Sequence, residues 1–440
     1  MARDLRGRHA RLHVDLDLRW TVPALVVFAA LRLLTVVGRR PAVGNDTPSY
    51  LEIEWWRGVR LPTVPIAFWL AGRDVDIIVW LQLVAASTMW AAAAVALVRL
   101  IGDRSVSRAL LAFLLALGAT RPVAGWDLTI QSESLSIGLW IALFAVTLHL
   151  VARPTRSRVI GWMVLAVLWL FCRQAHAYQL VLLVPGMLLV AARHRDERRL
   201  WVAMAAGVAL LSFVGVADSS NPALSRSSLS RIVCDRMIGN DSRIAWFREH
   251  GMPVLPRPAQ EPTDRQCFRV LESDREFRLW LEGPGYSTYT DFVVSHPGYI
   301  APALVERGSV VGVATGPDVS AARQVIPKAL ESLLWPRGTI GGVAFAMAIG
   351  VVGAGSVIVA RRRSVSTVQV CCLYAMTMVP PTVIIVWVGL PPPIQRQLVL
   401  AALQLRVALA VFVAVAAEKI LNSRASRDGR RRVEMGPGAT

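Results

Sequence analysis

The sequence predicts an all-α polytopic membrane protein. Of its 440 residues, 54% are hydrophobic and only 18% are charged, and the mean hydropathy is +0.48. Soluble domains usually carry about 25% charged residues and lack long apolar runs. The net charge is +18, but the arginines stand mostly at the ends of apolar runs, and no basic stripe with interleaved aromatic residues occurs. Nucleic acid is therefore not the expected partner, and anionic lipid headgroups are.

Ten apolar runs are candidates for membrane-spanning helices, because a hydrocarbon core about 30 Å thick needs ~20 mostly apolar residues per helix. Several runs are short and closely spaced, so nine to eleven spans fit the sequence. The predicted spans lie at roughly 20–38, 76–98, 107–123, 134–152, 158–173, 177–193, 200–217, 339–360, 366–388 and 397–417.

The distribution of Lys and Arg predicts the orientation. The segments assigned to one side of the membrane hold 24 basic residues and the short connections on the other side hold eight, so the first side is expected to be cytoplasmic, with both termini there. We expect a multi-pass protein of the cell (plasma or inner) membrane. Its expected parts are a cytoplasmic basic tail (1–19), an N-terminal transmembrane module of about seven helices (20–217) with a first external loop (39–75), an external domain (218–337), about three C-terminal transmembrane helices (338–417) and an Arg-rich cytoplasmic tail (418–440).

The long hydrophilic segment 218–337 holds 14 basic and 14 acidic residues. Its stretch 264–282 has the apolar spacing of an amphipathic helix, so we predict a small, mainly helical domain on the outer membrane face. Cys234 and Cys267 both lie in this segment, where oxidation is possible, and we predict that they form a disulfide. The other three cysteines, which lie in or next to spans, are expected to be small apolar fillers: Cys172, Cys371 and Cys372.

The first candidate for chemistry is Asp46, a few residues beyond the first predicted span. Tyr50 follows one helical turn later. Pro48 suits the first turn of a helix and Asp46 could cap that helix. The functional alternative is a carboxylate at the lipid–water boundary that takes a proton from an acceptor hydroxyl.

Two further candidates stand at outer helix ends. Glu133 leads directly into the fourth span, with Asp127 six residues earlier; simple charge complementarity at a helix N-terminus is the alternative explanation. Arg173, with His176 and Tyr178, forms a hairpin more polar than a plain turn requires. Arg173 could grip a phosphate, or it could simply extend its guanidinium to the interface.

Other arginines stand where membrane proteins rarely place them. Arg32 and Arg406 lie inside predicted spans, and each needs a partner or a path to water. Arg39, Arg40 and Arg396 add positive charge on the external side, against the general trend. Several arginines beside a pair of carboxylates would suit an anionic lipid head such as a polyprenyl phosphate.

The order of these motifs resembles the GT-C superfamily of integral membrane glycosyltransferases, in its bacterial dolichyl-phosphate-mannose mannosyltransferase-like branch. The similarity covers about residues 20–180, and weaker similarity continues to about residue 300. It departs from the oligosaccharyltransferase pattern, because Trp55-Trp56 is followed by Arg57 and not by Asp; protein N-glycosylation is therefore not implied. The motifs that carry it are Asp46 with Tyr50, a Gly-x-x-x-Pro-x-x-Pro stretch at 58–65, Ser132-Glu133-Ser134-Leu135, the Arg173 hairpin and a Tyr-x-x-Phe-x-x-x-His-Pro stretch at 289–297.

The resemblance implies a GT-C-like helical bundle and an inverting transfer of a sugar from a polyprenyl-phosphate-linked donor to an acceptor hydroxyl on the external face. In that scheme Asp46 is the base, and Glu133 orients the acceptor or shares the proton. Arg173 and Arg396 hold the phosphate. The acceptor would be a cell-envelope glycan, lipid or protein. The remaining substrate-binding residues would be Tyr50, His176 and Arg40.

Nothing in the chain requires a nucleotide-binding fold, and no cofactor is predicted. A carboxylate pair works with or without a divalent cation, so the sequence leaves metal dependence open. We expect the carboxylates of Asp46 and Glu133 to open into one external cavity lined by Arg173.

Two other functions stay open: a polyprenyl-linked polysaccharide ligase or polymerase, and a transporter of lipid-linked precursors. A transporter should carry its key charges mid-helix and show broken helices. Here the strongest signals cluster at outer helix ends, which favours the transferase.

Overall fold

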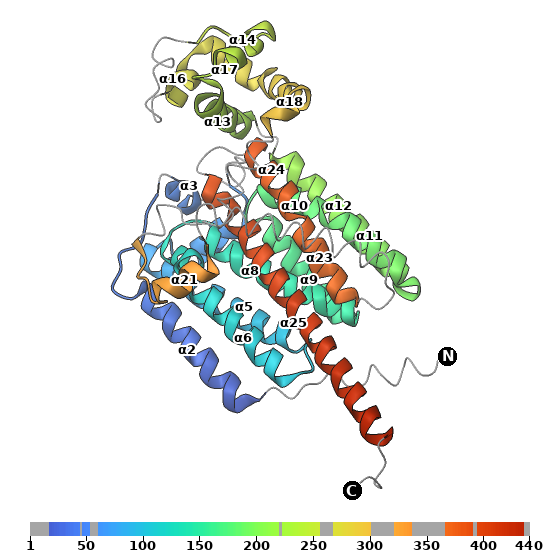
Figure 1. The fold of residues 1–440 in the computed structure, drawn as a ribbon. Coiled ribbons are helices and arrows are strands. Elements are labelled where there is room, and N and C mark those ends of the chain that lie inside the picture. Colours follow the sequence, from blue (N-terminus) through green and yellow to red (C-terminus); the bar gives the residue numbers. More distant parts are fainter. Residues whose placement is uncertain are drawn as a thin grey trace.

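All regular secondary structure in the described residues is helical (Figure 1). The only strand-like pairing there is an isolated parallel bridge between Ala42 and Thr129. The computed structural model describes residues 17–44, 46–52, 60–219, 222–255, 267–300, 321–336, 366–389 and 394–434.

Seven helical stretches in these ranges are long and apolar enough to cross a membrane. They match seven of the predicted spans, and the chain is therefore a helical, multi-pass membrane protein. The stretches are α2 (Leu18–Val36), α5 (Val75–Val98), α8 (Glu133–Ala152), α10 with α11 (Ala175–Val181, Leu183–Arg193), the 3₁₀ turn η4 with α12 (Arg195–Glu197, Arg198–Ser219), α23 with α24 (Thr367–Thr377, Val379–Gly389) and residues 398–423 of α25 (Ile394–Glu434).

The other three predicted spans have different outcomes. The run at 107–123 is not one straight helix: α6 (Arg104–Ala119) is followed, after a 55° bend, by α7 (Arg121–Ala124) and the 3₁₀ turn η3 (Gly125–Leu128). Thr120 is extended, with ψ 149°, and Pro122 has no N–H with which to continue the hydrogen bonds of α6. The run at 158–173 is the 15-residue helix α9 (Arg156–Leu170). The run at 339–360 lies outside the described residues.

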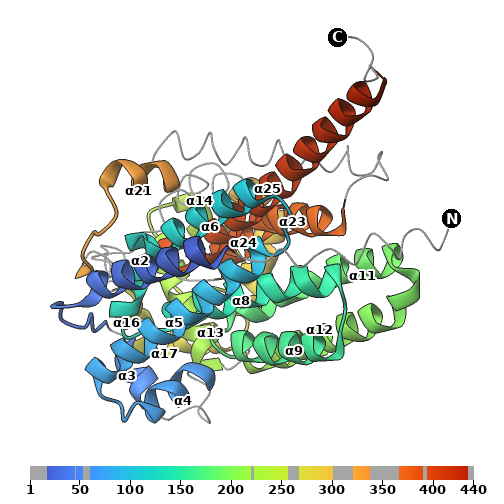
Figure 2. The same cartoon turned by 90° about the horizontal axis from the view of Figure 1, so that it is seen from below.

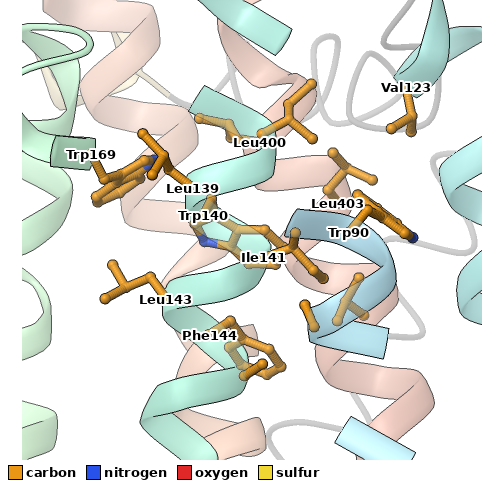
Figure 3. Packing of buried hydrophobic residues seen from close by; sticks show 14 of the residues in the cluster. Trp90, Val123, Leu139, Trp140, Ile141, Leu143, Phe144, Trp169, Leu400 and Leu403 are labelled. Atoms are coloured by element: carbon orange, nitrogen blue, oxygen red, sulfur yellow. The ribbon is translucent and has the colours of Figure 1, made fainter. Parts of the chain in front are cut away.

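The bundle keeps large apolar side chains on its outer surface, as contact with lipid requires. On α2, Val22 and Val26 are 52% and 62% exposed, and on α12 Phe213 is 71% exposed. Inside, α8 is packed on both sides by other helices, and Figure 3 shows its aromatic and aliphatic side chains in that core. Figure 2 shows α9, α11 and α12 grouped on one side of the bundle.

Helices α5 and α6 approach each other closely at Gly118. A Cβ atom at this position would lie 2.3 Å from the indole nitrogen of Trp90. That nitrogen donates a hydrogen bond of 2.8 Å to the carbonyl oxygen of Leu114. A glycine at position 118 is therefore what allows the buried Trp90 ring to lie against α6.

A separate helical unit with its own hydrophobic core lies at one end of the bundle (Figure 1). Its Cys234 and Cys267 form a disulfide, so the predicted pairing is confirmed. The unit comprises α13 (Pro222–Ile232), the π-turn η5 (Val233–Met237), α14 (Asp241–Glu249), α16 (Cys267–Ser273), α17 (Arg275–Glu282), α18 (Gly285–Ser295) and the 3₁₀ turn η6 (Pro297–Tyr299).

This unit is attached to the C-terminal end of α24. The hydroxyl of Tyr289 donates to the carbonyl oxygen of Val388 at 2.9 Å. Burial raises the pKa of Tyr289 above its ordinary value, so the phenol keeps the proton that it donates. Arg236 donates to the carbonyl oxygen of Trp387, and its guanidinium lies 4.4 Å from the centre of the Trp387 ring.

Removal of the disulfide should destabilise this unit selectively. Its two cysteines are 33 residues apart in sequence, and a cross-link that closes a loop of this kind contributes about 2–4 kcal/mol. We expect the double variant Cys234→Ala/Cys267→Ala to be cleaved faster by trypsin within residues 222–300. The free-thiol variant Cys371→Ala is the control, and equal cleavage of both variants would contradict the prediction.

The opposite end of the bundle gathers the basic connections. Asp17, before α2, pairs with Arg108 at the start of α6 at 2.5 Å. In the second half of α25, the carboxylate of Glu418 accepts a hydrogen bond of 2.6 Å from the backbone N–H of Gly102. His194, between α11 and α12, lies 3.0 Å from the hydroxyl of Thr367 at the start of α23. We call this the basic end, and α25 extends beyond it to Glu434 (Figure 1).

Candidate functional site

The loop after α2 lies directly on the connection between α7 and α8. The backbone N–H of Ala42 donates to the carbonyl oxygen of Leu128 at 2.9 Å, and the N–H of Ile130 donates to the carbonyl oxygen of Ala42 at 3.1 Å. Thr47, which is 1% exposed, donates to the carbonyl oxygen of Ile130 at 3.2 Å. These bonds fix the start of the short helix α3 (Thr47–Leu51) against the α7–α8 connection.

Asp46 stands just before α3, and Pro48 lies in the first turn, as predicted. The Asp46 side chain makes no capping hydrogen bond to α3, so the alternative that it caps this helix is wrong. Its carboxylate instead lies 3.2 Å from the guanidinium of Arg60, with side-chain exposures of 30% and 28%. Arg60 also donates from Nε to the hydroxyl of Ser49 at 2.8 Å and covers the ring of Tyr50 at 4.4 Å. This pair thus lies against α3 and is partly exposed to solvent.

Tyr50 connects this pair to the second predicted carboxylate. Its ring is 4% exposed, and its hydroxyl donates to Ser132 at 3.2 Å. The next residue, Glu133, begins α8 and forms an ion pair of 3.1 Å with Arg173. The structure therefore brings Asp46, Tyr50, Glu133 and Arg173 into one continuous set of contacts.

The Glu133–Arg173 pair is buried. The side chain of Glu133 has no exposed surface, and that of Arg173 is 9% exposed. The expectation that the Glu133 carboxylate opens into an external cavity is therefore wrong. A buried carboxylate is costly unless a cation is paired with it. Arg173 supplies that cation for Glu133.

His176, at the start of α10, is held against the first turn of α8. Its Nδ1 lies 2.6 Å from the carbonyl oxygen of Trp169, and its Nε2 lies 3.0 Å from the hydroxyl of Ser136. A carbonyl oxygen only accepts hydrogen bonds, so Nδ1 carries the proton and Nε2 accepts from Ser136. The imidazole ring also stacks on the Trp169 indole at 4.1 Å. Together these contacts fix the Arg173 hairpin against the start of α8.

A second buried ion pair lies at the bend after α6. Arg32 of α2 pairs with Asp127 of η3 at 2.6 Å, and both side chains are at most 2% exposed. Asp127 also accepts from the hydroxyl of Ser134 at 2.6 Å, and Arg32 donates to the carbonyl oxygen of Gly118 at 2.8 Å. The partner that Arg32 requires inside the membrane is thus Asp127.

Two residues of the site were missed by the sequence reasoning. Arg60 belongs to the Gly- and Pro-containing stretch, and only its contact with Asp46 shows its place in the site. Gln82 of α5 is fully buried, and its amide donates to the carbonyl oxygens of Asp127 and Thr129 at 3.0 and 2.8 Å. A glutamine inside an apolar helix was the available signal, because a buried amide needs partners.

Two predicted arginines lie apart from these contacts, and the side chain of a third is outside the described residues. Arg406 donates to the carbonyl oxygen of Leu334 at 2.7 Å and stacks on Trp335 at 4.1 Å, so it holds the short helix α21 (Lys328–Leu334) against α25. Arg40 is exposed in the loop after α2. Arg396 lies near the start of α25, where only the helix backbone is described.

The described side chains do not form a divalent-cation site. Within these ranges no three His, Cys, Asp or Glu side chains are grouped so that they could hold a metal ion. The carboxylates of Asp46 and Glu133 are each turned to an arginine. We therefore derive no chemical step through a metal.

The arrangement has a defined chemical capacity. A partly exposed carboxylate can accept a proton, and the neighbouring guanidinium groups can bind an anionic oxygen.

Comparisons of the chain with protein-family models, curated proteins and solved structures give no match.

Proposed function

We propose that this chain is a membrane glycosyltransferase that moves a sugar from a polyprenyl-phosphate-linked donor to an acceptor hydroxyl, with inversion at the anomeric carbon. One observation carries the proposal. The partly exposed Asp46–Arg60 pair and the buried Glu133–Arg173 pair are joined through Tyr50 and Ser132 at one end of an apolar helical bundle. A base and several cations at the edge of a membrane are the groups that a lipid-phosphate donor and a hydroxyl acceptor require.

The proposed reaction is a single displacement. The acceptor oxygen forms a bond to the anomeric carbon while the bond from that carbon to the phosphate oxygen breaks. The phosphate oxygen keeps the bonding electron pair, and polyprenyl phosphate leaves with one additional negative charge. The acceptor proton passes to the carboxylate of Asp46, which later returns it to water.

Charge development explains the arginines of the site. The leaving phosphate gains negative charge in the transition state, so preorganised cations accelerate the step. Arg60 and Arg173 are both held in place before any substrate binds. Arg40 and Arg396 belong to the same proposed phosphate-binding set. Tyr50, Glu133 and His176 are buried, and they position Arg60 and Arg173.

Substitution of Arg173 tests the donor-binding role. Arg173→Ala should weaken the binding of a polyprenyl-phosphate sugar, because a charge-assisted bidentate contact is lost. Arg173→Lys should recover only part of the affinity, since lysine lacks the planar fork. The readout is binding of the lipid-linked sugar to the purified chain. As a control, Arg121→Ala removes a half-buried arginine at the start of α7. Equal losses of donor binding in the two alanine variants would contradict the role of Arg173.

We further propose ten spans, with both termini in the cytoplasm and the unit at 222–300 outside. The proposal is supported by the basic end, where the connections rich in arginine gather. An impermeant thiol reagent should label Ser287→Cys, an exposed position on α18, in intact cells. Ser157→Cys, an exposed position at the basic end, should be labelled only after lysis. The reverse pattern would place the carboxylates on the cytoplasmic side and overturn the orientation.

A further inference from the structure

An apolar cavity of about 110 Å³ lies inside the bundle, away from the carboxylates. It is bounded by α8, α9, α10, α11, α12, α23 and α25, and none of its walls belongs to α2 or α3. Trp140, Leu143 and Phe144 form its α8 side, with Trp169 from α9 opposite (Figure 3). An apolar cavity of comparable size, ~150 Å³, stays dry and binds apolar molecules.

The cavity is elongated along the helices. Its lining on α8 runs from Trp140 to Val151, and at about 1.5 Å of rise per residue these two positions lie roughly 16 Å apart along the helix. A narrow space of this length fits one hydrocarbon chain better than a compact ligand. Leu189 of α11 lines the cavity and is 49% exposed, so the space reaches the lipid-facing surface of the bundle.

Two side chains that line this space, Trp169 and Trp201, carry buried hydrogen-bond donors. The indole nitrogens of Trp169 and Trp201 have no acceptor among the described residues, although the two side chains are only 4% and 1% exposed. Buried indole N–H groups normally have a partner. Trp201 lies on the first turn of α12, at the basic end. An acceptor oxygen near that end, such as the ester carbonyl of a lipid, would satisfy it.

The charge at this end selects the kind of lipid. Residues 193–199, between α11 and α12, hold four arginines against two acidic residues, and all four arginines are exposed. At the other end of the cavity the Trp169 ring is stacked on His176, which separates the cavity from the Glu133–Arg173 pair. A lipid would therefore enter with its headgroup at the basic end.

We propose that this cavity holds one acyl chain of an anionic phospholipid whose headgroup lies at the arginines of residues 193–199. The ester carbonyl of that chain accepts the hydrogen bond from Trp201. This lipid is distinct from the sugar donor, whose phosphate binds at the other end of the bundle, and the inference does not depend on the proposed reaction.

The experiment is a titration of the delipidated, full-length chain with phosphatidylglycerol, followed by native mass spectrometry. Wild type should bind one molecule more tightly than the rest, and more tightly than phosphatidylcholine. Val190→Trp, which fills the cavity, should remove this first binding step. Ile160→Trp, which adds the same ring at a 64% exposed position of α9, should retain it.

A second variant tests the proposal even if Val190→Trp fails to fold. Trp201→Phe keeps the ring and removes only the N–H donor, so the first binding step should weaken about fivefold, the effect of one ordinary hydrogen bond. Equal binding of the two phospholipids, or wild-type affinity in Val190→Trp and Trp201→Phe, would overturn the proposal. Tighter binding of polyprenyl phosphate than of phosphatidylglycerol at the same step would assign the cavity to the donor instead.

Discussion

Asp46→Asn should reduce sugar transfer by about 10²–10⁴-fold, the usual cost of removing a positioned general base. The amide has nearly the shape of the carboxylate and can still accept a hydrogen bond from Arg60, so folding should be retained. The measurement is the rate of sugar transfer by the purified variant, with a lipid-linked donor that wild type accepts. Thermal unfolding of the same sample reports whether the chain is intact.

Glu52→Gln is the matched control, because Glu52 is an exposed carboxylate at the end of the same short helix. Its transfer rate should stay within about twofold of wild type, as expected for a group outside the reaction. If Asp46→Asn transfers sugar as fast as Glu52→Gln, Asp46 is not the base. Glu133 and Asp127 would then be the remaining carboxylates to test.

Arg32→Met should lower the free energy of unfolding by about 3–5 kcal/mol, because removing one partner of a buried pair leaves an uncompensated charge. The charge left behind is that of Asp127, whose side chain has no exposed surface. Thermal or denaturant unfolding in detergent measures the loss. Arg32→Met combined with Asp127→Leu should recover most of it, since an apolar pair replaces the ion pair.

The control for this cycle lies on the same helix. Arg19 is exposed at the start of α2, and Arg19→Met should change the free energy of unfolding by less than about 0.5 kcal/mol, as surface substitutions usually do. If Arg32→Met costs no more than Arg19→Met, the Arg32–Asp127 pair does not stabilise the bend after α6.

The sequence predicted most of the membrane helices because hydrocarbon thickness sets their length and apolar character. It did not predict the bend after α6. Hydropathy is continuous through Gly118 and Val123, and the break depends on Pro122 and on contacts with distant parts of the chain. The carboxylate of Glu331 accepts from the backbone N–H of Arg121 at 3.2 Å, and Trp335 donates to Thr120 at 3.0 Å. Such partners cannot be read from local periodicity.

The candidate site was predicted in part. Asp46, Glu133 and Arg173 stood out because ionisable groups at a membrane edge are costly and rarely lack a role. Their pairing was not predictable, since a charged side chain does not indicate which distant group it will meet. Arg32 needed a partner or a path to water, and the sequence placed Asp127 only as a carboxylate six residues before Glu133.

The central claim is that this chain breaks the bond between a sugar and a polyprenyl phosphate. The most direct measurement is the release of polyprenyl phosphate from a panel of polyprenyl-phosphate sugars by the purified chain in the presence of candidate acceptor glycans. We expect release with at least one donor, coupled to glycosylation of the acceptor and absent in Asp46→Asn. Release that is equal in wild type and Asp46→Asn, or movement of intact lipid-linked sugar across a vesicle membrane without any release, would contradict the account.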